Sequence, residues 1–291
     1  GHLIANNLKY SYPNDLFLLN LHTGGYAIPN NPNDPDFTIP ENDSVANLSN
    51  LAGYPAGTVN RYQFPMTQGG GTAMSRGDWA DAVQDIISQP SYLNVGMVAE
   101  HDTSVDFITI MVEVYYTDSL PIDGFGFQPV NYLNVILTQD SVLGPQTGGS
   151  QYNPGAIVPG PWQPTYSHQH MVREYVTGQW GIPLNNTFVY PGDLITNYFT
   201  IPVPNNINDI IFDINNIKVV AFVTENQLGE IITGTGCDVT APVSVSINEY
   251  DLSKSDSYNR IYDMLGREWK VQFGNLPKGM YIINNKIQYK L

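Results

Sequence analysis

FITIMVEVY, residues 107–115, is the stretch that decides the fold class. The residues at even positions are all aliphatic and alternate with a more mixed set, which is the period of a β-strand. With residues 93–100 this stretch forms a predicted hairpin. Further strands are predicted at 132–139, 195–203, 217–224 and 243–247. Antiparallel strands at this spacing predict a β-sandwich of immunoglobulin-like character over residues 91–249, with a long insertion at about 140–192.

The part of the chain before residue 91 has a different pattern. LFLLNL, residues 16–21, is a near-continuous apolar run, typical of a strand that is covered on both faces in a parallel sheet. Helices are predicted near residues 1–10, from Asp43 or Ser44 to Leu51, and over 75–88, with a short strand at 58–64. Residues 1–90 are therefore predicted to form an α/β domain.

Charge and composition exclude several classes of function. The chain has 291 residues, 12 Lys and Arg against 27 Asp and Glu, and a net charge of -15. A chain without a basic patch is poorly suited to bind nucleic acid or an anionic membrane surface. No apolar run reaches the ~18–20 residues of a membrane-spanning helix, and a signal-peptide pattern is absent, so we expect a mature or trimmed chain.

The C-terminal residues differ from the rest in charge. Seven of the 12 basic residues lie within 248–291, where only five acidic residues occur. This shift predicts a separate module over residues 250–291.

The histidines are the first candidates for chemistry. His22 follows the predicted strand 16–21, at the edge where α/β sheets place their sites. No serine or cysteine nucleophile accompanies it in a recognisable motif, so a structural ring is favoured and no catalytic residue is assigned. His168 and His170 form the one close pair, which suits either a metal site or a loop that histidine hydrogen bonds hold together.

The loop NPNDPD, residues 31–36, offers oxygen ligands for a cation. Asp34 and Asp36 are the candidate calcium ligands, although the spacing of an EF-hand is absent. The alternative is a rigid, proline-bearing loop without a metal. Cys237 is the single cysteine, so these 291 residues form no internal disulfide, and a small buried side chain is the favoured interpretation.

Aromatic residues gather in the insertion. They form either an exposed platform for a sugar or a peptide, or the insertion's own small core. The residues are Tyr152, Trp162, Tyr166, Tyr175 and Trp180.

Three stretches together carry a resemblance to a known family. They are LNLHTGGYA at 19–27, LAGYPAGTVNR at 51–61 and MSRGDW at 74–79. They resemble the outer membrane protein 28-related family of Bacteroidetes, and the resemblance extends over about residues 1–245. The resemblance implies a thioredoxin-like domain followed by a β-sandwich, in surface or exported proteins that are discussed as adhesins or receptors.

The same resemblance gives Tyr54 and Pro55 a role. Pro55 takes the place of the thioredoxin-fold proline, whose preceding peptide bond is cis and lies beside the active site. Members of the family often carry Cys-x-x-Cys-Pro just before the sequence that matches Gly1–Ala5 here. The resemblance therefore implies a redox pair and a first strand upstream of this chain. Redox chemistry needs two thiols, and these 291 residues hold one.

The tail carries a second resemblance. IYDMLGRE at 261–268 and LPKGMYII at 276–283 are similar to the C-terminal sorting signal of type nine secretion. This resemblance implies that the secretion machinery recognises the tail. A small β-domain that only packs on the rest of the chain is the alternative.

Together these features predict an α+β multidomain protein. A truncated thioredoxin-like domain is followed by the sandwich and a sorting domain. We expect an exported protein, at the outer membrane surface or extracellular, that binds an extracellular protein or glycan without catalysis. Binding is expected at Tyr54, Pro55, His22, Trp162, Tyr166 and Trp180. The alternative function is an extracytoplasmic thiol-disulfide oxidoreductase with its Cys-x-x-Cys upstream.

Overall fold

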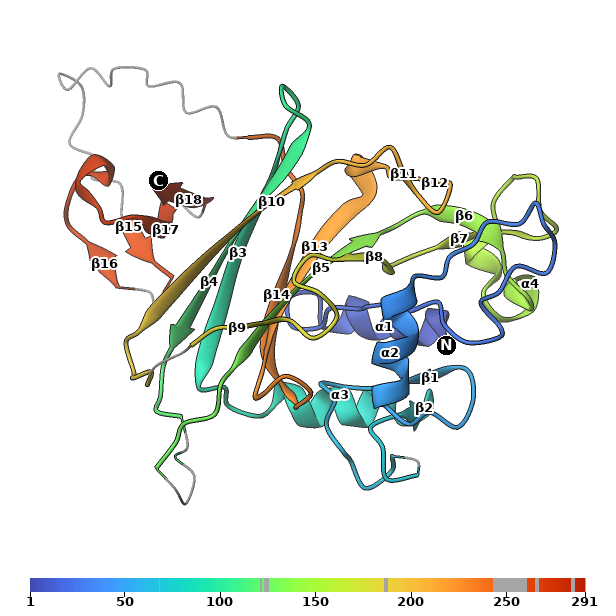
Figure 1. Cartoon of the computed structure of the whole chain (residues 1–291), viewed down its shortest axis with the longest axis horizontal. Helices are drawn as coiled ribbons and strands as arrows, with labels where there is room; N and C mark the ends of the chain where they lie inside the picture. Colours follow the sequence, from blue (N-terminus) through green and yellow to red (C-terminus); the bar gives the residue numbers. More distant parts are fainter. Residues whose placement is uncertain are drawn as a thin grey trace. The chain divides into compact units, whose positions relative to one another are not determined.

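The computed structural model describes residues 1–67, 69–120, 122, 126–185, 188–242, 261–264, 267–283 and 286–290. The chain divides into two units, Gly1–Ala241 and Pro242–Leu291, which are described separately below. Figure 1 shows the first unit as sheets with a few short helices along one side. The coarse prediction of a β-rich chain is confirmed, while the predicted division at residues 90 and 249 stays a prediction.

Two antiparallel sheets form the body of the first unit (Figure 1). One has the order β10-β4-β3. The other follows the path β14-β13-β5-β8, and β9 also pairs with β5. The first sheet consists of β3 (Leu93–Asp102), β4 (Phe107–Tyr116) and β10 (Leu194–Pro202). The second consists of β5 (Tyr132–Gln139), β8 (Met171–Tyr175), β9 (Ile182–Pro183), β13 (Ile217–Thr224) and β14 (Ile231–Asp238).

The two sheets share one apolar core. From β4 it takes the residues at even positions, including Ile110 and Val112, and from the other sheet it takes Leu137 of β5 and Val219 of β13. The period-two pattern of FITIMVEVY therefore has a direct cause, because one face of β4 lies entirely in this core. The strands predicted near 93–100, 105–117, 132–139, 195–203 and 217–224 are present. The strand predicted at 243–247 lies outside the described residues.

Strand β14 was not predicted from the sequence. Its IITGTGCD contains two glycines where most strands carry large side chains. A Cβ on Gly234 would lie 2.7 Å from the carbonyl oxygen of Ala221, and one on Gly236 would lie 2.6 Å from the ring of Phe17. These close approaches explain why glycine occurs in a paired strand.

The insertion forms regular structure of its own. β6 (Val142–Pro145) pairs with β7 (Thr165–His168), with α4 (Gly149–Tyr152) and η1 (Pro154–Ala156) between them. From β8 the buried Arg173 donates to the carbonyl oxygens of Ile207 and Ile210. These bonds hold the hairpin of β11 (Asn206–Ile207) and β12 (Ile210–Ile211). The helical turn η2 (Ile214–Asn216) leads into β13.

The first 90 residues contain less β-structure than predicted. The helices are α1 (His2–Ser11), α2 (Pro40–Leu48) and α3 (Trp79–Ile87), and β1 (Ala56–Gly57) pairs with β2 (Met74–Ser75). The strand predicted at 58–64 is absent. The strand predicted at 16–21 is reduced to a single parallel bridge between Asn20 and Met171.

The misread segment 16–21 packs by one face rather than two. Phe17, Leu19 and Leu21 contact the outer face of the five-stranded sheet, where Ile136 and Phe222 are buried. The apolar run therefore covers a sheet instead of lying inside one.

The second unit contains a four-stranded sheet with the order β16-β15-β17-β18. Its strands are β15 (Ile261–Asp263), β16 (Glu268–Trp269), β17 (Gly279–Ile283) and β18 (Lys286–Lys290), and η3 (Phe273–Asn275) lies between β16 and β17. The buried Asp263 accepts bonds from the Arg267 side chain at 2.7 Å and from the Trp269 indole at 3.0 Å. The predicted linker at 250–257 lies outside the described residues.

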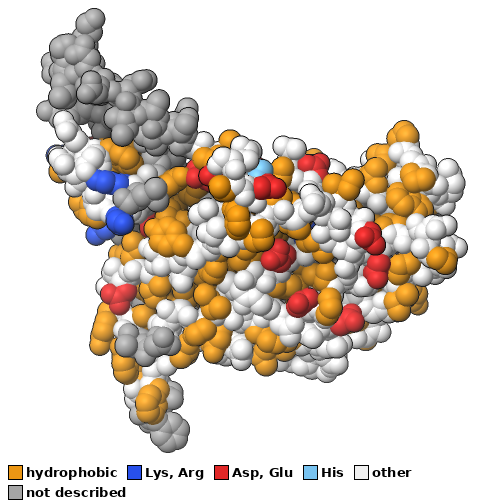
Figure 2. All heavy atoms as spheres, turned by 45° about the horizontal axis from the view of Figure 1, so that its top comes forward, with side chains coloured by type: hydrophobic (Ala, Val, Ile, Leu, Met, Phe, Trp, Pro, Cys, Tyr) orange, Lys and Arg blue, Asp and Glu red, His pale blue; other side chains and the backbone are white. Residues whose placement is uncertain are grey.

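In the part of the chain that the structure describes, no helix is long and apolar enough to cross a bilayer. On the face in Figure 2 the acidic side chains are spread among uncharged and hydrophobic ones.

Candidate binding site

Tyr54 and Pro55 lie at the surface beside the first residues of the chain. The peptide bond between them is cis, as the family resemblance implies. A Cβ on Gly1 would lie 2.9 Å from the Cβ of Pro55 and 3.5 Å from the ring of Trp79. Gly1 at the start of α1 therefore packs directly between Pro55 and Trp79.

Tyr54 and Tyr26 form an exposed aromatic pair. Their ring centroids are 5.6 Å apart in an edge-on arrangement, and the side chains are 48% and 89% exposed. The hydroxyl of Tyr54 lies over Gly24, whose φ of +67° belongs to the left-handed region. Glycine is favoured there by its backbone conformation, and a Cβ would also displace that hydroxyl from its place over the loop. We call Tyr26, Tyr54 and Pro55 the aromatic pair site.

The loop that carries Tyr26 is anchored to α2. The hydroxyl of Thr23 and the backbone N–H of Gly24 both donate to the carboxylate of Asp43, the latter at 3.1 Å. These two bonds lower the pKa of Asp43, the Thr23 bond more than the Gly24 bond. The amide of the fully buried Asn42 donates to the carbonyl oxygen of His22 at 3.2 Å. Two neighbouring residues of α2 therefore fix the position of this loop.

His22 belongs to a buried aromatic cluster behind this loop. Its ring centroid lies 5.1 Å from Phe37 and 5.2 Å from His168, and Phe37 and His168 are 4.8 Å apart. Tyr166 is 5.0 Å from His168, and its hydroxyl lies 2.6 Å from Nδ1 of His2. We call His2, His22, Phe37, Tyr166 and His168 the histidine cluster. It joins α1 and the loop after residue 21 to the β6–β7 hairpin.

The three histidines of this cluster are neutral at pH 7. Burial, and after it the nearby positive charge of other groups, lowers the pKa of His2 and His22 to about 4 and that of His168 to about 3. Asn153 donates to the Tyr166 hydroxyl at 2.7 Å, and the same hydroxyl shares a hydrogen bond with Nδ1 of His2. One buried nitrogen on each of the three rings has no hydrogen-bond partner among the described groups.

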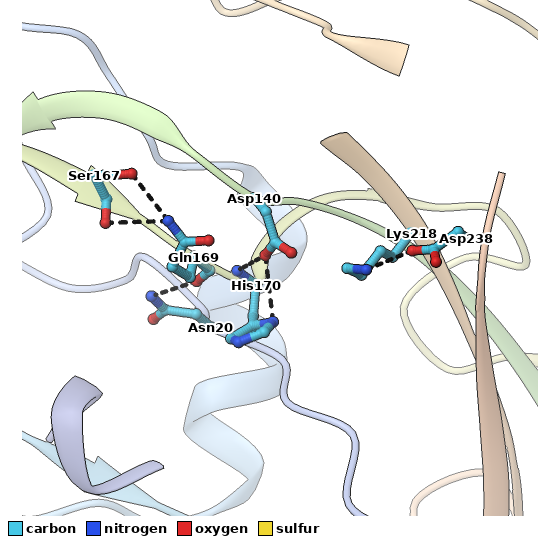
Figure 3. A network of polar contacts seen from close by, with 7 residues as sticks. All are labelled: Asn20, Asp140, Ser167, Gln169, His170, Lys218 and Asp238. Atoms are coloured by element: carbon cyan, nitrogen blue, oxygen red, sulfur yellow. Dashed lines mark hydrogen bonds and ion pairs between the residues drawn. The ribbon is translucent and has the colours of Figure 1, made fainter. Parts of the chain in front are cut away.

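His170, the other half of the predicted pair, points elsewhere. Its backbone N–H donates to Asp140 at 2.7 Å, and its Nδ1 lies 3.3 Å from the same carboxylate oxygen (Figure 3). It sits in a turn at φ +56°, between His168 of β7 and the start of β8. In Figure 3 the side chain of Asn20, in the segment 16–21, donates to the carbonyl oxygen of Gln169, next to His170. Within the described residues, no group of three His, Cys, Asp or Glu side chains is placed to hold a metal ion.

The aromatic residues of the insertion are divided between several places. Tyr166 is only 2% exposed, because its ring lies in the histidine cluster, so it is not part of an exposed platform. Trp162 lines an open cavity of about 640 Å³ together with Pro159, Gln163 and Thr165. Trp180 is half-buried just before β9. Binding at Trp162 and Trp180 stays a prediction, as does the alternative that aromatic residues form the insertion's own small core.

The candidate calcium ligands bond within their own loop. Asp36 accepts from the backbone N–H of Thr38 at 2.9 Å and from its hydroxyl at 2.7 Å, and Asp34 accepts from the Asn31 amide at 3.0 Å. Cys237 lies in β14 against the shared core, and burial raises the pKa of its thiol to about 12. This thiol is therefore protonated and inert at neutral pH.

Sequence reasoning located Tyr54 and Pro55 but missed Phe37 and His2. His2 and Tyr166 are 164 positions apart, and no spacing in the sequence marks them as neighbours. Only the contact between α1 and the β6–β7 hairpin brings them together.

Comparison with known proteins gives two similarities. The family model described as outer membrane protein Omp28 matches residues 42–235. A solved structure, a domain of the outer membrane lipoprotein Omp28 from Porphyromonas gingivalis, is 20% identical and covers 53% of this chain and 92% of its own, with a TM-score of 0.32. No curated protein matches the chain.

Proposed function

Because the chain belongs to the outer membrane protein Omp28 family, we propose that it is a surface-associated protein of the outer membrane that binds an extracellular protein through the aromatic pair site. The observation that carries this proposal is the exposed contact between Tyr26 and Tyr54. Tyrosines of this kind offer a large apolar surface at a small cost in side-chain entropy and are enriched among the residues that dominate binding energy.

The way in which the surrounding residues hold the aromatic pair in place favours binding over catalysis. The Asp43 bonds hold the loop that carries Tyr26, and the missing side chain of Gly24 lets the Tyr54 hydroxyl lie close to the backbone of that loop. A surface fixed before binding loses less entropy when a partner docks. The single thiol, Cys237, belongs to β14 and packs, partly buried, against the shared core.

Binding to arrays of purified extracellular proteins and of free glycans tests the proposal. We expect the double variant Tyr26→Ala, Tyr54→Ala to bind its protein partner at least about thirty-fold more weakly, as for hot-spot residues worth ~2 kcal/mol. Tyr152→Ala is the matched control, since Tyr152 is also exposed but lies in α4. If the unmodified chain, the double variant and the Tyr152→Ala control bind equally well, the role of the pair is refuted. Binding to glycans alone identifies a different ligand class.

A second function is favoured by the packing of Gly1 against Pro55. In a longer form of the chain, a Cys-x-x-Cys directly before Gly1 would lie beside Pro55, as in a thiol-disulfide oxidoreductase. Reduction of insulin disulfides distinguishes the two functions. We expect chain 1–291 to be inactive, because dithiol chemistry needs two thiols and these residues hold one. If the longer form is no faster than its double Cys→Ser version, the oxidoreductase function is refuted.

A further inference from the structure

Strand β10 is a long edge strand without the usual protection. It is the outermost strand of the order β10-β4-β3, and its one strand partner among the described residues is β4. The opposite edge of this sheet is covered, because Thr240 exchanges backbone bonds with β3 at Ala99 and His101. The nine residues of β10 include no charged side chain, and its single proline, Pro202, is the last residue. Exposed edges in natural proteins are usually guarded by charges, by central prolines or by short length.

The direction of the free backbone groups follows from the pairing with β4. The N–H of Tyr116 donates to the carbonyl oxygen of Asp193, and the N–H of Val203 donates to Asp106, so odd-numbered residues of β10 point their backbone groups toward β4. The backbone groups of Leu194, Thr196, Tyr198 and Thr200 therefore point outward. Pro202, which lacks an N–H, also falls on this outward set, where a missing donor breaks no bond to β4.

The sequence of this edge is nearly the same when read backwards. In LITNYFTIP, Ile195 and Ile201 are equidistant from Tyr198, and so are Thr196 and Thr200. Antiparallel pairing of two copies about a two-fold axis at Tyr198 would therefore place isoleucine with isoleucine, threonine with threonine and tyrosine with tyrosine. A two-fold interface uses the same surface of both copies, and paired threonines and paired aromatic residues stabilise neighbouring strands.

We propose that two copies of the chain pair antiparallel through β10, with Tyr198 of each copy opposite Tyr198 of the other. The pairing joins the two three-stranded sheets into one continuous six-stranded sheet. Its outer face carries the exposed residues Leu194, Thr196, Tyr198 and Thr200 of both copies.

Sedimentation of the full chain over a range of concentrations tests the pairing. We expect a monomer–dimer equilibrium, and we expect Tyr198→Lys to raise the dimer dissociation constant at least about ten-fold, because two like charges then oppose each other across the axis. Tyr152→Lys, at another exposed tyrosine that lies outside any strand, should leave the dissociation constant unchanged. A wild-type chain that stays monomeric at every concentration overturns the proposal.

Disulfide trapping tests the register and does not depend on the stability of the lysine variant. Paired residues at this position have Cα atoms ~5.5 Å apart, within the range that a disulfide spans. With oxidised glutathione, Tyr198→Cys should form covalent dimers, Thr196→Cys alone should not, and a mixture of Thr196→Cys with Thr200→Cys should. Cross-linking of Thr196→Cys alone as fast as Tyr198→Cys overturns the proposed register.

Discussion

The paired sheets and the N-terminal segment are held by contacts of different kinds. Between the sheets, side chains such as Val112 and Leu137 are fully buried in a core of mainly apolar side chains. The N-terminal segment instead packs through half-buried residues such as Leu19 and through the histidine cluster, where buried nitrogens lack partners. Full burial of large apolar side chains makes the first contact strong, whereas partial burial and unpaired polar atoms weaken the second. The comparison teaches that the contact around the N-terminal segment is the one most easily opened.

The largest expected effect distinguishes these two contacts by the same substitution in each. Leu137→Ala should lower the free energy of unfolding by about 2–5 kcal/mol, because it leaves a cavity in the shared core. Leu19→Ala should cost about half as much, since Leu19 is only half-buried. Urea denaturation of both variants measures the difference. Equal losses would show that the N-terminal segment contributes as much as the core.

Acid should weaken the N-terminal contact before the sheets. The folded-state pKa values of His22 and His168 lie below the ordinary 6.5, so the unfolded chain binds more protons in acid. The stability that the folded state gains from keeping these histidines neutral is therefore complete above pH 6.5 and is lost as the pH falls toward 4. Each of these histidines should lower the free energy of unfolding by about 2 kcal/mol at pH 5 relative to pH 7.

Hydrogen exchange at pH 7 and pH 5 checks this effect. We expect α1 to lose protection at pH 5 while β4 and β5 keep theirs. His168→Phe should reduce the loss, because it removes one titrating group and leaves an aromatic ring among Phe37 and Tyr166. Protection of α1 that does not change between the two pH values contradicts the role of the cluster.

A smaller effect comes from a single hydroxyl. Tyr166→Phe removes the group that links Asn153 to His2 and leaves both of those side chains without this partner. The free energy of unfolding should fall by about 1–3 kcal/mol, the cost of leaving a buried polar group unpaired. Tyr190→Phe is the control at an exposed tyrosine. If the two variants unfold alike, the Tyr166 hydroxyl contributes nothing to this contact.

The sheets could be predicted from the sequence because their signal is local. FITIMVEVY alternates since one face of β4 lies in the core, and a period of two is visible in nine residues. The prediction of a strand covered on both faces at LFLLNL, residues 16–21, was wrong for a physical reason. An apolar run cannot show whether it lies inside a sheet or across the face of another one, as Phe17, Leu19 and Leu21 do. Strand β14 was missed since Gly234 and Gly236 serve close approach rather than strand propensity.

The candidate site divides in the same way. Tyr54 and Pro55 are neighbours in the sequence, and the family resemblance singles them out. Tyr26 meets Tyr54 only because Asp43 holds the loop after His22, and this contact depends on the tertiary structure. The position of Tyr166 also depends on its partners, since an aromatic residue in an insertion has no local sign of burial.

The smallest expected effect concerns the loop at residues 31–36. Asp36 caps its own turn through Thr38, so Asp36→Ala should lower the free energy of unfolding by about 0.5–1 kcal/mol whether or not calcium is present. Thermal melting of both proteins with added calcium and with a chelator separates this local role from the predicted metal site. A ligand that binds only the folded state raises the melting temperature with its concentration. A calcium-dependent rise that Asp36→Ala abolishes would establish the metal site, whereas the same small loss in both solutions assigns Asp36 to the turn alone.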